Sequence, residues 1–324
     1  MRKLGLILMA SVLLAGCSST ASSAASSAPA STAATASLSA ASAPASADSS
    51  GLSILAPYGA PALSLIPAFK SGYDITTVDG ADPLQAAFVN PSPEYDAIIA
   101  PTNLGMKLYQ AGKSEYELLS VVTWGNLYIV ADSDDAMQKE GEFAAFGEQA
   151  VAGLVFNSEF TSVTPNITWY NSVTEAQAAL LSGKANAALL AEPAATATIA
   201  KAKESGKDLK IIADLQANFN GGEGYPQAGL FVRKSSYEAD PGKFEDLATN
   251  MATYFDSLPD DDTTQLKADI DSIGTETLGI PSSEIVTKVW KRMNIRIVSA
   301  ASVQDQISSF LGLFGIDKTD GIIQ

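Results

Sequence analysis

The groups that this sequence offers for chemistry are neutral polar side chains and backbone amides. Three short segments, 58–60, 101–103 and 157–160, each follow a predicted strand. In an open α/β sheet, ligands bind beyond the carboxyl ends of strands, where helix N-termini present free N–H groups. The segments therefore predict ligand contacts, with helix capping as the alternative role of the same residues. The candidate residues are Tyr58, Gly59, Ala60, Thr102, Asn103, Ser158 and Phe160.

Aromatic residues between these segments are further candidates. Thr123 and Trp124 stand in a polar interruption of a β-prone run, and Tyr225 follows a glycine-rich stretch. Together with Tyr58 and Phe160, these rings offer stacking surfaces for a flat ligand. Burial in the core is the alternative for Trp124, because tryptophan in a strand is a common core residue.

Acid–base and metal chemistry are restricted by composition. The sequence contains no histidine and a single cysteine, Cys17. Ser-His-Asp and Cys-His hydrolysis, histidine zinc sites, Cys-based metal sites and intramolecular disulfides are thereby excluded. The sequence has 20 Lys and Arg residues and 36 Asp and Glu residues, which gives a formal charge of −16. This negative charge disfavours nucleic acid and anionic membranes as partners. The sequence predicts no catalytic residue, no metal and no cofactor.

The N-terminal segment has the pattern of an export signal. Arg2 and Lys3 precede an apolar run over 4–14, shorter than the ~20 residues that a membrane-spanning helix needs. The run ends in Leu-Ala-Gly-Cys, which resembles a bacterial lipobox. That resemblance implies a signal peptide over 1–16 and a diacylglyceryl group on Cys17; a secretory signal with a chance cysteine is the alternative. Residues 17–50, rich in Ser, Ala, Thr and Pro, predict a disordered tether.

From residue 51 onward, strands and helices alternate, which predicts a parallel sheet with helices on its faces. No transmembrane helix is predicted there. The predicted strands are 52–56, 73–78, 95–100, 118–130 with an interruption at 123–126, 149–156, 168–170, 185–190, 209–213 and 227–233. The predicted helices are 62–69, 83–89, 104–110, 174–182, 194–203, 243–258, 263–273, 282–293 and 302–314.

Five motifs, in order, resemble the type II solute-binding proteins of ABC importers. Among these proteins the chain looks most like the branch of the yeast thiamine-precursor protein and of the nitrate, sulfonate and taurine binders. The resemblance spans about 51–314 and implies a two-lobed α/β fold with the ligand in the cleft. The motifs are Ala-Pro-Tyr-Gly-Ala-Pro (56–61), Asp-Ala-Ile-Ile-Ala-Pro-Thr-Asn-Leu-Gly (96–105), Val-Val-Thr-Trp-Gly-Asn (121–126), Ala-Leu-Leu-Ala-Glu-Pro (188–193) and Tyr-Pro-Gln-Ala-Gly-Leu-Phe-Val (225–232).

The resemblance also implies how the lobes are divided. Strands near 123–128 and 227–232 would cross between them. Lobe 1 is then 51–124 plus 229–324, and lobe 2 is 125–228. Glu192 lies at the lobe 2 edge of the cleft. It is expected either to accept a hydrogen bond from a ligand or to act as a surface acid that contacts the permease or charges a helix N-terminus.

A lipid-anchored receptor on the outer face of the bacterial membrane, working with an ABC permease and its ATPase, is the expected function. The lipid is its only expected membrane contact. An orphan surface sensor is the alternative. Enzymes with a similar fold are disfavoured. The yeast protein consumes a histidine, and this chain has none; porphobilinogen deaminase needs a cofactor-bearing cysteine, and the single cysteine here, Cys17, is assigned to the anchor. Lys and Arg are absent from the three strand-end segments, which favours a neutral or cationic heteroaromatic solute over sulfonate or nitrate.

Overall fold

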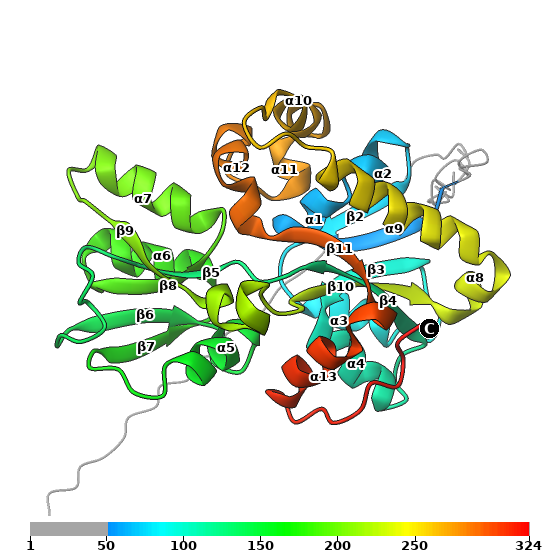
Figure 1. Cartoon of the computed structure of the whole chain (residues 1–324), viewed down its shortest axis with the longest axis horizontal. Coiled ribbons are helices and arrows are strands. Elements are labelled where there is room, and N and C mark those ends of the chain that lie inside the picture. The colour runs from blue at the N-terminus through cyan, green and yellow to red at the C-terminus, as the bar shows by residue number, and fades with distance from the viewer. Residues whose placement is uncertain (1–50, 324) are drawn as a thin grey trace, which may run out of the picture. The chain divides into compact units, whose positions relative to one another are not determined.

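The computed structural model describes residues 51–323, so the predicted signal peptide, Cys17 and the tether lie outside the described residues. The described chain forms two β-sheets, each covered by helices (Figure 1). We call the elements packed on the six-stranded sheet the larger lobe and those on the five-stranded sheet the smaller lobe. The predicted two-lobed α/β architecture is confirmed, while the residue boundaries of the lobes stay a prediction.

The larger sheet holds β1 (Ser53–Pro57), β2 (Asp74–Val78), β3 (Ala97–Pro101), β4 (Tyr116–Thr123), β10 (Ala228–Arg233) and β11 (Ile295–Ser299). Their order is β11-β4-β10-β3-β1-β2. Strand β1 is parallel to both β2 and β3, so the carboxyl ends of these three strands lie at one edge. Strand β10 is antiparallel to β3 and β4, because the chain enters it on returning from the smaller lobe.

The smaller sheet holds β5 (Leu127–Ala131), β6 (Glu142–Phe146), β7 (Asn166–Tyr170), β8 (Ala187–Ala191) and β9 (Lys210–Asp214). Their order is β7-β6-β8-β5-β9, with β6 parallel to β7 and β8 and with β5 antiparallel to β8 and β9. Two stretches, 124–126 and 215–227, connect the sheets; we call them the crossing segments. They are hydrogen-bonded to each other, since Tyr225 N–H donates to Trp124 O (3.2 Å).

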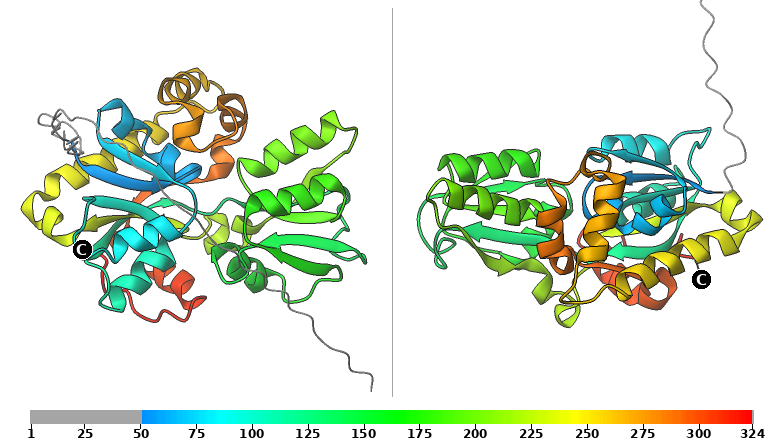
Figure 2. Two further views of the ribbon diagram at one scale, coloured as in Figure 1. Left: turned by 180° about the vertical axis from the view of Figure 1, so that it is seen from behind. Right: turned by 90° about the horizontal axis from the view of Figure 1, so that it is seen from above.

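Helices cover both faces of each sheet (Figure 2). On the larger lobe they are α1 (Ala60–Ser64), α2 (Ile66–Lys70), α3 (Asp82–Phe88), α4 (Thr102–Gln110), α8 (Lys234–Ala239), α9 (Pro241–Asp256), α10 (Thr264–Ile273), α11 (Thr275–Leu278), α12 (Ser283–Val289) and α13 (Gln304–Gly312). On the smaller lobe they are α5 (Val151–Glu159), α6 (Val173–Ser182) and α7 (Ala194–Glu204). Short 3-10 turns are η1 (Leu215–Asn218), η2 (Asn220–Gly222), η3 (Trp290–Met293) and η4 (Ala300–Val303). Among residues 51–323, no helix has the length and apolar character to cross a membrane.

Alternation along the strands divides the core into layers. In β3, Ile98 packs on one face of the larger sheet with Phe231, whereas Ile99 packs on the other face with Leu230. The same alternation holds in the smaller sheet. Ile129 of β5 belongs to the apolar cluster on one face, whereas Val130 belongs to the cluster on the other face. Strands buried on both faces read as continuous apolar runs, which is why the sequence revealed them.

Two secondary-structure expectations are corrected. Residues 149–156, predicted as a strand, belong mainly to helix α5, whose buried residues Ala152, Val155 and Phe156 have helical spacing. The strand at this place is β6, which was not predicted. An apolar run of this length does not by itself distinguish a strand from a buried helix. Strand β11 was also missed, since its five residues follow directly on a predicted helix.

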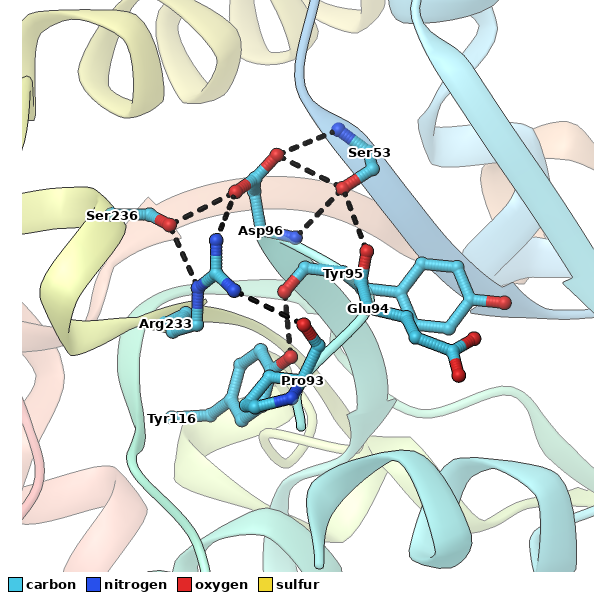
Figure 3. A network of polar contacts seen from close by, with 8 residues as sticks. All are labelled: Ser53, Pro93, Glu94, Tyr95, Asp96, Tyr116, Arg233 and Ser236. Carbon is cyan, nitrogen blue, oxygen red and sulfur yellow. Dashed lines mark hydrogen bonds and ion pairs between the residues drawn. The ribbon is translucent and has the colours of Figure 1, made fainter. Parts of the chain in front are cut away.

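A polar network joins the amino ends of β1 and β3 to α8 (Figure 3). Asp96 accepts hydrogen bonds from Ser53 N–H (3.0 Å), from Ser236 Oγ (2.9 Å) and from Arg233 (2.7 Å). Burial raises the pKa of Asp96, but these bonds and the Arg233 charge outweigh it and hold the pKa below its ordinary value. The carboxylate therefore stays ionised at neutral pH, and the network fastens the strand ends opposite to the expected ligand edge.

Candidate ligand-binding site

A junction of three strand ends brings predicted site residues together. Strand β10 begins between the ends of β3 and β4, where Ala228 pairs with both Pro101 and Thr123. Thr102 N–H donates to Gln227 O (3.0 Å), and Gln227 N–H donates to Thr123 O (3.0 Å). Thr102, Thr123 and Gln227 therefore meet where β3, β4 and β10 converge, beside the crossing segments.

Polar side-chain atoms at this junction are buried without a partner. Within residues 51–323, the atoms of this kind include Thr102 Oγ1, Asn103 Oδ1, Thr123 Oγ1 and Gln227 Oε1. The exposed fraction is 0% for Thr102 and 1% for Thr123. A buried polar atom without a hydrogen bond costs about 1–3 kcal/mol. Four such atoms lie on residues at or next to this junction, and a hydrogen bond from a bound molecule or an ordered water would remove that cost.

The amide of Gln227 is oriented by its neighbours. Its Nε2 donates to Asn126 Oδ1 (3.0 Å), and Asn126 Nδ2 donates in turn to the backbone oxygen of Glu192 (3.0 Å). Because Nε2 is engaged in this bond, Gln227 Oε1 is the amide atom that remains to accept a hydrogen bond from a solute. Neither Gln227 nor Asn126 was among the predicted site residues, although both stand in motifs that carried the resemblance.

The segment after β1 lies at the same edge as the junction. Gly59 is the N-cap of α1 with φ 86°, and its N–H already donates to Leu278 O (2.9 Å). Ala60 is buried, whereas Tyr58 is 40% exposed and packs over Gly279. At Thr102 and Asn103, helix α4 has no side-chain capping bond, so the capping alternative is not observed there.

Trp124 lies in the core rather than on an open surface. Its ring is fully buried within the larger lobe's cluster, and its indole N–H donates to Arg296 O (2.9 Å). The guanidinium of Arg296 stands 4.4 Å from the centre of the ring. The face expected to stack on a ligand is therefore occupied, because the chain returns at β11 to cover it.

Tyr225 is also fully buried. It stacks on Phe310 of α13, with ring centres 5.4 Å apart, and its hydroxyl donates to Gln216 Oε1 (3.3 Å). Burial raises the pKa of the Tyr225 phenol well above its ordinary value, so it remains neutral. Tyr225 therefore lies in the core in this arrangement, and its role as a ligand surface stays a prediction.

Ser158 and Phe160 lie at the wrong end of α5 for the predicted role. Ser158 donates to Val155 O (2.8 Å) within the helix, and Phe160 stacks on Phe156 at 5.1 Å. Residues 157–159 form the last turn of α5 and Phe160 is its C-cap, so this segment does not follow a strand. The segment that follows a strand here is 147–150, between β6 and α5, and none of its residues was among the predicted site residues.

Glu192 has internal partners for both carboxylate oxygens. Oε2 accepts from the backbone N–H of Thr196 (3.1 Å), and Oε1 accepts from the Thr196 hydroxyl (2.8 Å) and from Arg292 Nε (2.9 Å). Its side chain is fully buried. Of the expected roles, the charge at a helix N-terminus matches these contacts, since Thr196 lies in the first turn of α7.

No family model matches the chain, and no curated protein matches it. Solved structures do match. A crystal structure of an ABC transporter from Parabacteroides distasonis shares 19% identity over 85% of this chain and 98% of its own, with a TM-score of 0.69. The periplasmic aliphatic sulphonate-binding protein SsuA of Escherichia coli shares 15% identity over 85% and 92%, with a TM-score of 0.61.

The periplasmic nitrate-binding protein NrtA of Synechocystis PCC 6803 shares 11% identity, over 72% of this chain and 68% of its own, with a TM-score of 0.53. The chain has the fold of a type II solute-binding protein. At these identities the likeness establishes the fold, as the sequence motifs implied. In this solute-binding fold, the unpartnered atoms lie where the larger sheet meets the crossing segments. Among residues 51–323, no group of three His, Cys, Asp or Glu side chains is placed to hold a metal ion.

Proposed function

We propose that this protein is the extracytoplasmic solute-binding component of an ABC importer. It captures a small solute between its lobes by hinge closure about the crossing segments and delivers the solute to a membrane permease. The observation that carries the proposal is the cluster of unpartnered polar atoms on Thr102, Asn103, Thr123 and Gln227, within a fold shared with ABC-transporter binding proteins.

The chemistry of this cluster supports a solute that donates hydrogen bonds. Gln227 Oε1 and Asn103 Oδ1 are carbonyl oxygens, which only accept, while the hydroxyls of Thr102 and Thr123 can do either. Nitrate and ionised sulfonate groups carry no donor for the two carbonyls. A neutral or cationic heteroaromatic with N–H groups carries donors for these carbonyls, and the exposed ring of Tyr58 offers it a stacking surface at the same edge.

The proposal includes a lipid anchor at Cys17, supported by the lipobox-like tetrapeptide that ends in the only cysteine. We expect Cys17→Ala to move the protein from the membrane fraction to the soluble extracytoplasmic fraction. Metabolic labelling with a radioactive fatty acid measures the modification directly. Labelling that persists in the variant would contradict the assignment.

Binding is tested by a thermal-shift screen of pyrimidines, polyamines, amino acids, sulfonates and nitrate. A cognate solute at 100 times its Kd should stabilise the folded protein by about 2.7 kcal/mol. X-ray scattering with and without that solute measures closure as a fall in the radius of gyration. A confirmed solute that leaves the radius of gyration unchanged would contradict hinge closure.

Thr102→Val separates binding from stability at the site. Valine has nearly the shape of threonine and removes a buried hydroxyl that has no partner among the described residues. The unliganded variant should therefore unfold at the same temperature or higher, while its affinity for the solute falls about tenfold. Unchanged affinity would remove Thr102 from the site.

A further inference from the structure

One short segment of the larger lobe fastens itself to the end of β4. We call residues 290–296, which span η3 and the start of β11, the bridging segment. Asn294 O accepts from Trp124 N–H (2.9 Å), and Asn294 Nδ2 donates to Trp124 O (2.7 Å). Beyond Asn294, Ile295 pairs with Thr123 in the larger sheet. The bridging segment is thus held rigidly against the first crossing segment.

From this base, Arg292 reaches the smaller lobe. Its Nε lies 2.9 Å from Glu192 Oε1, and a second nitrogen donates to Thr196 Oγ1 (2.6 Å). Its backbone oxygen accepts from the hydroxyl of Tyr128 in β5 (3.0 Å). All three partners belong to the smaller lobe, where α7 faces α12 of the larger lobe (Figure 1). The contact therefore joins the two lobes, in addition to the crossing segments, the packing of α7 near α12 and the packing of Phe310, Leu313 and Phe314 on the smaller lobe's core.

The carboxylate in this contact is fully buried, whereas Arg292 keeps 43% of its side chain exposed. A buried carboxylate that loses its cation is strongly unfavourable. Among residues 51–323, Arg292 is the residue that forms an ion pair with Glu192. Separation of the lobes would break this pair, so the pair favours the arrangement in which they are close.

The same contact is connected to the candidate ligand site. Gln227 Nε2 donates to Asn126 Oδ1, and Asn126 Nδ2 donates to Glu192 O. Glu192 N–H donates back to Asn126 O (2.9 Å). These hydrogen bonds thus connect the side-chain amide of Gln227 to the backbone of Glu192, the residue whose carboxylate Arg292 holds.

We propose that the Arg292–Glu192 pair is an interlobe latch. Arg292 is a positioning residue: it holds the lobes together and strengthens solute binding without touching the solute. The effect on binding rests on the proposed function, whereas the effect on the lobes does not. Loss of the latch lowers the population of the binding-competent arrangement, so the apparent Kd rises in proportion.

The test measures the distance between the lobes without any ligand. Spin labels are placed at the exposed positions Lys203 on α7 and Asp261 on the larger lobe, in a full-length chain carrying Cys17→Ser. Arg292→Gln should shift the distance distribution by pulsed electron resonance to longer values. The matched control is Lys291→Gln, because Lys291 is the adjacent residue of η3 and pairs with Asp260 inside the larger lobe.

A second variant, Glu192→Gln, removes the charge from the other side of the pair and should lengthen the distance in the same way. A distance that is unchanged or shorter in both variants overturns the latch. Where a solute has been identified, Arg292→Gln should also weaken its affinity, by about tenfold for a tenfold shift in lobe population. Failure to find any solute would count against the proposed function and leave the distance result intact.

Discussion

Replacing Trp124 by alanine is expected to lower the free energy of unfolding by about 3–5 kcal/mol. The ring is fully buried, its N–H bond to Arg296 O would be lost, and the cavity would open between the crossing segments and β11. Urea unfolding measures the loss as a lower midpoint. In the present arrangement no solute reaches the ring, so the affinity for a solute should change less than the stability.

Trp169→Ala is the control, since it removes the same side chain from a half-buried position in β7. Its midpoint should fall less than that of the Trp124 variant. A Trp124 variant that keeps its midpoint but loses solute binding would place the ring at the ligand surface, one of the two roles that the sequence left open for it.

Gly224→Ala is the second substitution with a large expected effect, a loss of about 2–5 kcal/mol in the free energy of unfolding. Gly224 has φ +85°, which an L-residue adopts only at a cost. A Cβ at this position would lie 1.9 Å from Trp124 O and 2.9 Å from Asn294 Nδ2. The backbone of one crossing segment would have to move away from the other.

Gly221→Ala isolates the steric part of that loss. Gly221 belongs to the same loop and also has positive φ, at +68°, but a Cβ there would meet no described atom within 4 Å. We expect Gly221→Ala to lower the free energy of unfolding by about 1–2 kcal/mol, which is the cost of placing an L-residue at positive φ. If both variants lose the same free energy of unfolding, the backbone near Gly224 moves away from the added Cβ at little energetic cost.

Local signals in the sequence located many of the elements correctly. Helix α6 was predicted over 174–182 with Gly183 as its end, and the structure shows Ser172 capping its start and Gly183 in the left-handed conformation. Capping residues and periodicity act within a few positions, so they can be read from a single sequence. The same information failed at α5, where a short apolar run suited either a strand or a helix.

Contacts between distant residues decided the rest. Arg292 lies 100 positions from Glu192, and the Trp124 indole bonds to a residue 172 positions away. No local pattern marks such a pair, because the energy of the contact depends on how the two lobes close around it. The aromatic residues were judged by their polar neighbours in sequence, whereas β11 and α13, packed from the far end of the chain, bury them.

By itself, the sequence determined the composition limits, the export-signal pattern and the alternation of strands and helices, since charge and apolar runs are properties of the chain alone. The two lobes were implied by the resemblance of its motifs to solute-binding proteins. The tertiary structure alone decided which polar groups are left without partners. Thr102 and Thr123 are ordinary strand-end residues in the sequence. That position made them candidates, and the structure adds that both hydroxyls are buried without a partner, because β10 returns between β3 and β4 and pairs with these strands through its backbone.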